Sequence, residues 1–167
     1  MKLTMKQKVF SLKERFFIYD ENGHDVYQVV GKILSLGHKL TILDRDDQEV
    51  GYIHQKLLSL TPKYFIQLPG QEEVELKGHV SLLRDHYTLK APGGDWEIRG
   101  DFLSHEYEMI QRGQVVASVT RKFFSWGDTY LLDISPVASP LLALSVMLAI
   151  DCVMSDTTRN ASTHVNN

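Results

Sequence analysis

Lysine residues recur at one place in a short repeated pattern, and their chemistry suits the binding of an anion. Each is followed by two apolar residues, a serine and another apolar residue, as in Lys32-Ile33-Leu34-Ser35-Leu36. The lysines of this pattern are Lys8, Lys32, Lys56 and Lys122. If the repeats form equivalent units, their ammonium groups would line part of one rim and bind an anionic ligand or a lipid head group. The more common role of such lysines is to solubilise the end of a strand and block its pairing with other chains.

One carboxylate stands in an unusual place. Asp151 directly follows an apolar run that covers residues 141–150. Because an unpaired buried carboxylate is costly, we expect Asp151 to emerge at an opening of the fold or to accept hydrogen bonds there. We interpret it as a structural residue, and a functional acid is the alternative.

The sequence predicts no metal site. Its histidines occur at no recurring ligand spacing, so hydrogen-bonded or solvated side chains are the expected role. Those considered are His24, His38, His54, His79, His86 and His105. The acidic stretch at residues 44–49 lacks the glycine and the terminal ligand of a calcium-binding loop, and a charged hairpin tip is the better interpretation.

No familiar catalytic or nucleotide-binding motif occurs in the chain. It has no nucleophile elbow, phosphate-binding loop, dinucleotide fingerprint or His-Glu-x-x-His motif, so we expect a non-enzymatic protein without a cofactor. The net charge of −3 argues against nucleic-acid binding. Residues 1–8 lack the apolar stretch of a secretory signal, which predicts a cytoplasmic protein.

Serines mark the joints between the repeated units. Ser11, Ser35 and Ser59 follow one another at intervals of 24 residues. A further full copy of the pattern surrounds Ser125, and weaker copies surround Ser81 and Ser104. These six joints divide the chain into short segments, and we assign the serines of the full copies a structural role.

The segments between joints have the pattern of strand, turn and strand. The turns contain residue pairs that favour positive φ or a tight bend, between runs rich in β-branched and aromatic residues. They are Asn22-Gly23, Asp46-Asp47, Pro69-Gly70, Pro92-Gly93-Gly94 and Arg112-Gly113. Six joints therefore predict about twelve antiparallel strands, which would close into a barrel and remove exposed edges.

The apolar run near the C-terminus predicts a helix inside this barrel. Ser139 is a good N-cap and Pro140 a good first helical residue. A helix that is apolar on every side is normally buried, and twelve strands leave an interior too wide for side chains alone. A membrane anchor is the alternative, but a membrane span needs about 20 apolar residues and this run is shorter.

Several short motifs, in order along the chain, resemble those of the LURP-one-related family. They are Phe10-Ser11-Leu12, Ile18-Tyr19-Asp20, Leu34-Ser35-Leu36-Gly37, Gly100-Asp101-Phe102, Phe124-Ser125-Trp126-Gly127-Asp128 and Ala149-Ile150-Asp151. That family is grouped with the tubby C-terminal domain and the phospholipid scramblases. The resemblance implies a mainly β fold, a tubby C-terminal-like barrel of about twelve antiparallel strands around a central hydrophobic C-terminal helix. We expect one domain over residues 1–156 and a polar, disordered tail over residues 157–167.

The leading functional hypothesis is a binding protein. It would bind an anionic ligand such as a phospholipid head group, or a protein partner, on the outer surface of the barrel, with at most peripheral membrane contact. The first alternative is scramblase-like lipid translocation that uses residues 141–150 as an anchor. A second alternative is an enzyme with an acid–base site formed by Asp151 and a nearby histidine. The sequence defines neither the ligand nor the oligomeric state.

Overall fold

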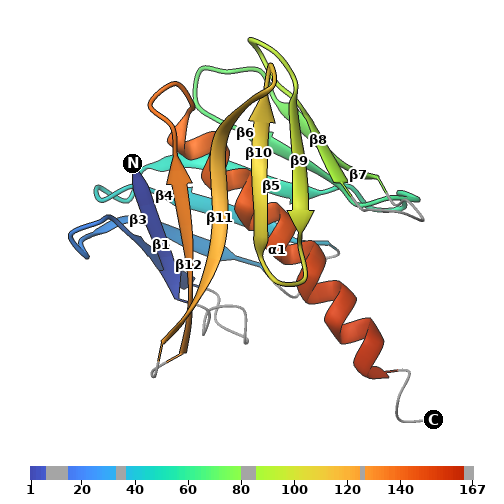
Figure 1. Cartoon of the computed structure of the whole chain (residues 1–167). Helices are drawn as coiled ribbons and strands as arrows, with labels where there is room; N and C mark the ends of the chain where they lie inside the picture. Colours follow the sequence, from blue (N-terminus) through green and yellow to red (C-terminus); the bar gives the residue numbers. More distant parts are fainter. Residues whose placement is uncertain (7–14, 33–36, 80–85, 125–126, 164–167) are drawn as a thin grey trace.

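The protein is a closed barrel of twelve antiparallel strands wrapped around one helix (Figure 1). The computed structural model describes residues 1–6, 15–32, 37–79, 86–124 and 127–163. The elements are β1 (Lys2–Lys6), β2 (Arg15–Tyr19), β3 (Asp25–Gly31), β4 (Lys39–Leu43), β5 (Glu49–Gln55), β6 (Lys63–Gln67), β7 (Val74–His79), β8 (His86–Lys90), β9 (Trp96–Asp101), β10 (Glu106–Gln111), β11 (Gln114–Phe124), β12 (Gly127–Ile134) and α1 (Pro140–Thr163). The fold class predicted from the repeats is confirmed.

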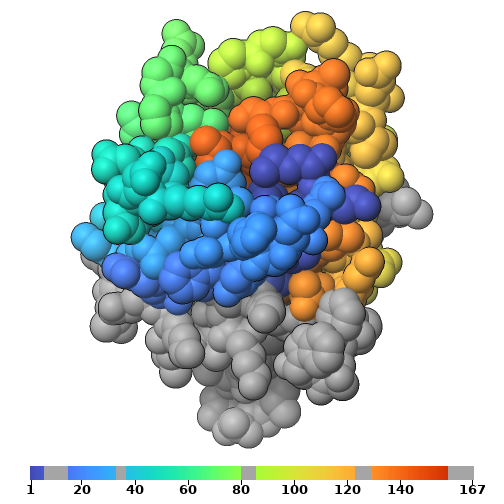
Figure 2. All heavy atoms as spheres, turned by 90° about the vertical axis from the view of Figure 1, so that its left-hand side faces the viewer, coloured from blue at the N-terminus to red at the C-terminus, as the bar shows by residue number. Residues whose placement is uncertain are grey.

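Pairing of β1 with β12 closes the sheet. Lys2 lies opposite Asp133 and Lys6 opposite Thr129, and every other strand pairs with its neighbours in sequence. The N-terminal amine also donates a hydrogen bond of 3.0 Å to the carbonyl oxygen of Ile134. In Figure 2 the orange segment that leads from β12 into the helix lies between the dark blue N-terminal strand and the cyan and green strands. Each of the twelve described strands is therefore paired on both sides, which leaves no free edge among them.

Tight turns at the predicted positions connect the strands of each hairpin. The connection between β10 and β11 has Arg112 at a φ of 50° and Gly113 at a φ of 75°. Two successive positive φ values give the turn a twist that matches the twist of the paired strands. Side chains then alternate between the two faces, and in β7 Val74 and Leu76 point inward while Glu75 and Lys77 point outward. The inward set forms the wall of the core.

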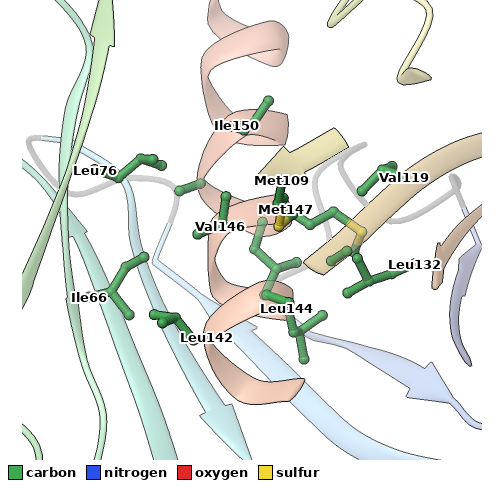
Figure 3. Packing of buried hydrophobic residues seen from close by; sticks show 14 of the residues in the cluster. Ile66, Leu76, Met109, Val119, Leu132, Leu142, Leu144, Val146, Met147 and Ile150 are labelled. Atoms are coloured by element: carbon green, nitrogen blue, oxygen red, sulfur yellow. The ribbon is translucent and has the colours of Figure 1, made fainter. Parts of the chain in front are cut away.

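The helix fills the barrel from end to end. The Ser139 hydroxyl accepts a hydrogen bond of 3.3 Å from the backbone N–H of Leu142, which caps the first turn. Residues 142–153 are buried, and the one polar side chain of the apolar run, Ser145, donates a hydrogen bond of 2.7 Å to the carbonyl oxygen of Leu141. Figure 3 shows helix residues such as Leu144 and Met147 packed among inward-facing residues of several strands. The helix therefore supplies the centre of the core.

Length and composition alone would also allow this helix to cross a membrane. The segment concerned is Pro140–Thr157, and 67% of it is buried inside the protein. Burial within the barrel accounts for the apolar character of residues 142–153. The helix continues to Thr163, through residues for which the sequence predicted a disordered tail, and its last turns project beyond the strands (Figure 1). Residues 164–167 lie outside the described part of the chain.

Candidate functional site

Three of the four candidate lysines lie at one end of the barrel. Lys32 directly follows β3, Lys56 directly follows β5, and Lys122 lies near the end of β11. Odd-numbered strands of an antiparallel meander run in the same direction, so their ends share one end of the barrel. All three side chains are exposed. We call this the lysine end, whereas Lys8 lies outside the described residues.

The opposite end of the barrel is acidic. It consists of the turns within the hairpins and is called the hairpin end here. The carboxylates in and beside these turns are Asp20, Glu21, Asp44, Asp46, Asp47, Glu72, Glu73 and Asp95. The basic side chains in and beside the same turns are Arg45, Lys90 and Arg112, and Lys90 forms an ion pair with Asp95. Among the described residues, carboxylates therefore outnumber basic side chains at this end of the barrel.

Carboxylates also build the hairpin turns themselves. One carboxylate oxygen of Asp44 accepts hydrogen bonds of 2.9 Å from the backbone N–H groups of Asp46 and Gln48. Such side-chain bonds stabilise the turn locally. The acidic stretch at residues 44–49 thus includes a charged hairpin tip, as the sequence predicted.

Exposed leucines accompany the lysines. After Lys56, the chain forms an irregular segment in which Leu57 is exposed and both Leu58 and Leu60 are fully exposed. Leu58 has a φ of 56°, a conformation that costs an ordinary side chain about 1 kcal/mol or more. Backbone strain and clustered exposed apolar side chains both occur at interaction sites of proteins.

Two pockets open beside this segment. The smaller, of about 320 Å³, lies between residues 55–63 and the helix residues Val153, Asp156 and Thr157. The larger, of about 910 Å³, is lined by the ends of β7, β8 and β9 and by the same part of the helix. Pro62 and Val153 contribute to both pockets. They therefore lie side by side where the helix leaves the barrel.

Asp151 faces a histidine at the same end. Its carboxylate lies 3.5 Å from Nδ1 of His105, and the two side chains are only 9% and 12% exposed. Burial raises the pKa of Asp151 to about 7. The His105 ring also lies against Tyr130, with ring centroids 4.5 Å apart. The sequence predicted that Asp151 would emerge at an opening of the fold or accept hydrogen bonds there, and the structure places its carboxylate beside His105.

Two buried phenols of the core have no hydrogen-bond partner among the described residues. They are the hydroxyl groups of Tyr107 and Tyr64. Burial is the main cause that raises the pKa of Tyr107, and the charge of Asp151 adds to it. Neither Asp151 nor His105 is among the described residues that line the two pockets. Within the described residues, neither of these two pockets therefore reaches the pair directly.

An ion pair fixes the projecting part of the helix. Nε2 of His38 lies 2.9 Å and 3.0 Å from the two carboxylate oxygens of Asp156. His38 precedes β4, so the contact joins the helix to the rim of the barrel.

The remaining candidates contribute less to this surface. Ser59 is exposed and lines the smaller pocket, whereas Ser11, Ser35 and Ser125 lie outside the described residues. Within the part of the chain that the structure describes, no three His, Cys, Asp or Glu side chains are grouped to hold a metal ion. Sequence reasoning missed the contribution of His79, His86 and Arg99 to the larger pocket, because their proximity depends on strand register.

The closed twelve-stranded barrel with a helix along its interior defines the class of protein. The sequence model of the LURP-one-related family matches residues 1–151, and the chain belongs to that family. It is 34% identical over 154 residues to the uncharacterized protein YxjI of Bacillus subtilis, a match that covers 92% of this chain and 94% of the relative. It is also similar in fold to the X-ray structure of an Arabidopsis thaliana protein, with a TM-score of 0.58 and 15% sequence identity over 94% of this chain and 91% of that one.

Proposed function

We propose that this protein is a non-enzymatic binding protein that attaches to anionic membrane surfaces through the lysine end of its barrel. The observation that carries the proposal is the coincidence of fully exposed Leu58 and Leu60 with Lys32, Lys56 and Lys122 at one end, opposite an acidic end. A cytoplasmic protein of this kind would meet the anionic lipids of the inner leaflet.

The magnitudes support reversible attachment. Each lysine near an anionic bilayer contributes about 1 kcal/mol, so the three described lysines contribute about 3 kcal/mol. Each leucine side chain that enters the apolar part of the bilayer contributes a further ~1.5 to 3 kcal/mol. Leu58 and Leu60 are exposed on the irregular segment and could enter it in this way. The carboxylates of the hairpin end would be repelled by the same surface. The barrel would therefore bind in one orientation, with its core helix still enclosed.

Co-sedimentation with lipid vesicles tests the proposal. We expect the protein to sediment with vesicles that contain phosphatidylserine, to bind phosphatidylcholine vesicles much less, and to lose binding as salt is raised. The variant Lys32→Glu, Lys56→Glu, Lys122→Glu should bind at least a hundredfold more weakly, by the arithmetic of about 1 kcal/mol for each charge. Leu58→Ser with Leu60→Ser should weaken binding about a hundredfold or more, since the two leucines together contribute at least ~3 kcal/mol.

Matched control variants lie at the other end of the barrel. Lys90→Glu changes an exposed lysine beside a hairpin turn, and Val137→Ser changes an exposed apolar residue there. Both should bind anionic vesicles as the unchanged protein does. Equal binding to neutral and anionic vesicles, or an equal loss in the control variants, would contradict the proposal.

A further inference from the structure

The larger pocket has one polar wall and one apolar wall. Its volume of about 910 Å³ is within the range of sites that enclose small organic molecules. The polar wall is built by residues at the ends of β7, β8 and β9, and the apolar wall by the turn after β9 and by the helix. A pocket of this kind selects a ligand with two chemically different ends.

Three side chains with nitrogen donors, here called the nitrogen row, lie next to one another across the polar wall. His79 pairs in register with His86, and His86 with Arg99, so the three side chains stand side by side on adjacent strands. The two imidazole rings stack with centroids 4.7 Å apart and an angle of 8° between their planes. Nε2 of His79 lies 2.9 Å from the hydroxyl oxygen of Thr88, which fixes that ring. The row is therefore ordered before any ligand arrives.

The neighbouring carboxylates already have partners. Glu97 forms an ion pair with Arg99, and the carboxylate of Asp101 accepts hydrogen bonds of 3.0 Å and 2.7 Å from the backbone N–H and the hydroxyl of Ser104. Arg99 keeps further donors, since a guanidinium has five N–H groups. Burial, the neighbouring His86 and the charge of Lys77 together lower the pKa of His79. An anion bound at the row would oppose these effects by favouring the protonated form of His79.

The apolar wall is rigid and reaches the surface. Phe102 is buried against Tyr87 in an edge-to-face contact, with ring centroids 4.8 Å apart. Leu103 is exposed above it, and Val153 and Met154 of the helix complete the wall. The apolar part of a ligand could pack against these side chains while its polar head contacts the nitrogen row.

We propose that this pocket binds one molecule of an amphiphile from solution, with its oxyanion head at His79, His86 and Arg99 and its apolar chain against Phe102, Leu103 and Met154. The head is a carboxylate or a phosphate, because both accept several hydrogen bonds from nitrogen donors in one place. This site goes beyond the membrane attachment proposed above, since it uses none of the lysines and none of the exposed leucines of the segment after Lys56.

Titration calorimetry with four probes tests the site. The probes are decanoate, decyl phosphate, decanol and inorganic phosphate, with the two anionic amphiphiles kept below the concentration at which they form micelles and decanol kept below its solubility. We expect decanoate or decyl phosphate to bind one molecule per chain, at least tenfold more tightly than decanol and inorganic phosphate. The tighter of the two anionic probes identifies the head group. Binding of decanol as tight as that of both anionic probes would overturn the proposal, and so would the absence of binding by either anionic probe.

Variants separate this site from the membrane-binding surface. His79→Gln with His86→Gln should weaken the preferred anionic probe about tenfold or more, whereas His54→Gln, on the outer face of β5, should not change its binding. An unchanged affinity in the double variant, or an equal loss in His54→Gln, would overturn the proposed head-group site. The double variant should still sediment with anionic vesicles, and the triple lysine variant should still bind the probe. Failure of one proposal is therefore distinguishable from failure of the other.

Discussion

Replacing Asp151 with asparagine should stabilise the protein, and the gain should grow as pH rises. In the unfolded chain this carboxyl group has its ordinary pKa of 3.8, whereas burial raises its pKa to about 7 in the folded barrel. Because the folded state holds the proton more tightly, ionisation destabilises the fold. The stability of the unchanged protein should thus fall as pH rises from about 4, and the fall should level off above about 7.

The size of the effect follows from the two pKa values. Between about pH 5 and about pH 8 the unfolded carboxyl group is already ionised, while the folded group remains protonated until about pH 7. Each pH unit in which only the folded state holds the proton corresponds to about 1.4 kcal/mol, so the interval gives about 2 to 3 kcal/mol. Asparagine has no such proton and should show none of this loss. The free-energy difference between variant and unchanged protein should therefore increase by about 2 to 3 kcal/mol.

Urea unfolding followed by tryptophan fluorescence measures this difference at each pH. Titrating groups that do not contact Asp151, such as His79, are common to both proteins and cancel in the comparison. The variant His105→Gln provides a second check. The imidazole 3.5 Å from the carboxylate can offset part of its negative charge, so the total loss of stability between low and high pH should be larger without it. A stability difference between the Asp151 variant and the unchanged protein that stays constant from pH 5 to pH 8 would refute the argument, because it would mean that burial does not control this carboxyl group.

Three further predictions concern the barrel and its core. Gly100 has a φ of 149°, and a Cβ there would lie 2.4 Å from a backbone carbonyl oxygen of β10. Gly100→Ala should therefore lower the free energy of unfolding, measured with urea, by at least ~2 kcal/mol. The control Gly23→Ala, whose Cβ would lie in open space, should lower it by about 1 kcal/mol. Leu144→Ala should lower the unfolding free energy by about 2 to 5 kcal/mol, since this side chain is fully buried in the helix at the centre of the barrel. Asp156→Ala removes the ion pair with His38, so amide exchange in the last turns of the helix should rise about two- to fivefold, measured by mass spectrometry, while exchange in the first turns stays unchanged.

Local chemistry made the barrel predictable. The turn at Asn22-Gly23 needs a residue with positive φ, and Gly23 has a φ of 81°. The start of the helix needs an N-cap and a proline, and Ser139 and Pro140 supply them. Such signals act over a few residues, so a single sequence displays them. The regular recurrence of turns and serine joints along the sequence then predicted the number of strands.

The functional surfaces depend on contacts between distant parts of the chain. His105 reaches Asp151 because the turn between β9 and β10 bends inward toward the helix, with His105 itself at a φ of 54°. The nitrogen row of the larger pocket requires the register that places His86 between His79 and Arg99. No local pattern specifies such a register before the barrel has closed. In contrast, the location of Lys32 and Lys56 at one end of the barrel could be predicted from the sequence. Each lysine follows the second strand of a hairpin, and these strands run in the same direction because the hairpins follow one another along the chain.

The position of the core helix also affects how the chain must fold. During synthesis every strand leaves the ribosome before residues 142–153 do, so the inward faces of the strands exist for a time without the element that covers them. The barrel also needs contact between β1 and β12, which are far apart in the chain. Folds dominated by such distant pairings form slowly, and exposed apolar strands aggregate. The nascent chain should therefore depend on chaperones until its last helix has been made, and productive folding should begin only after most of the chain has been translated.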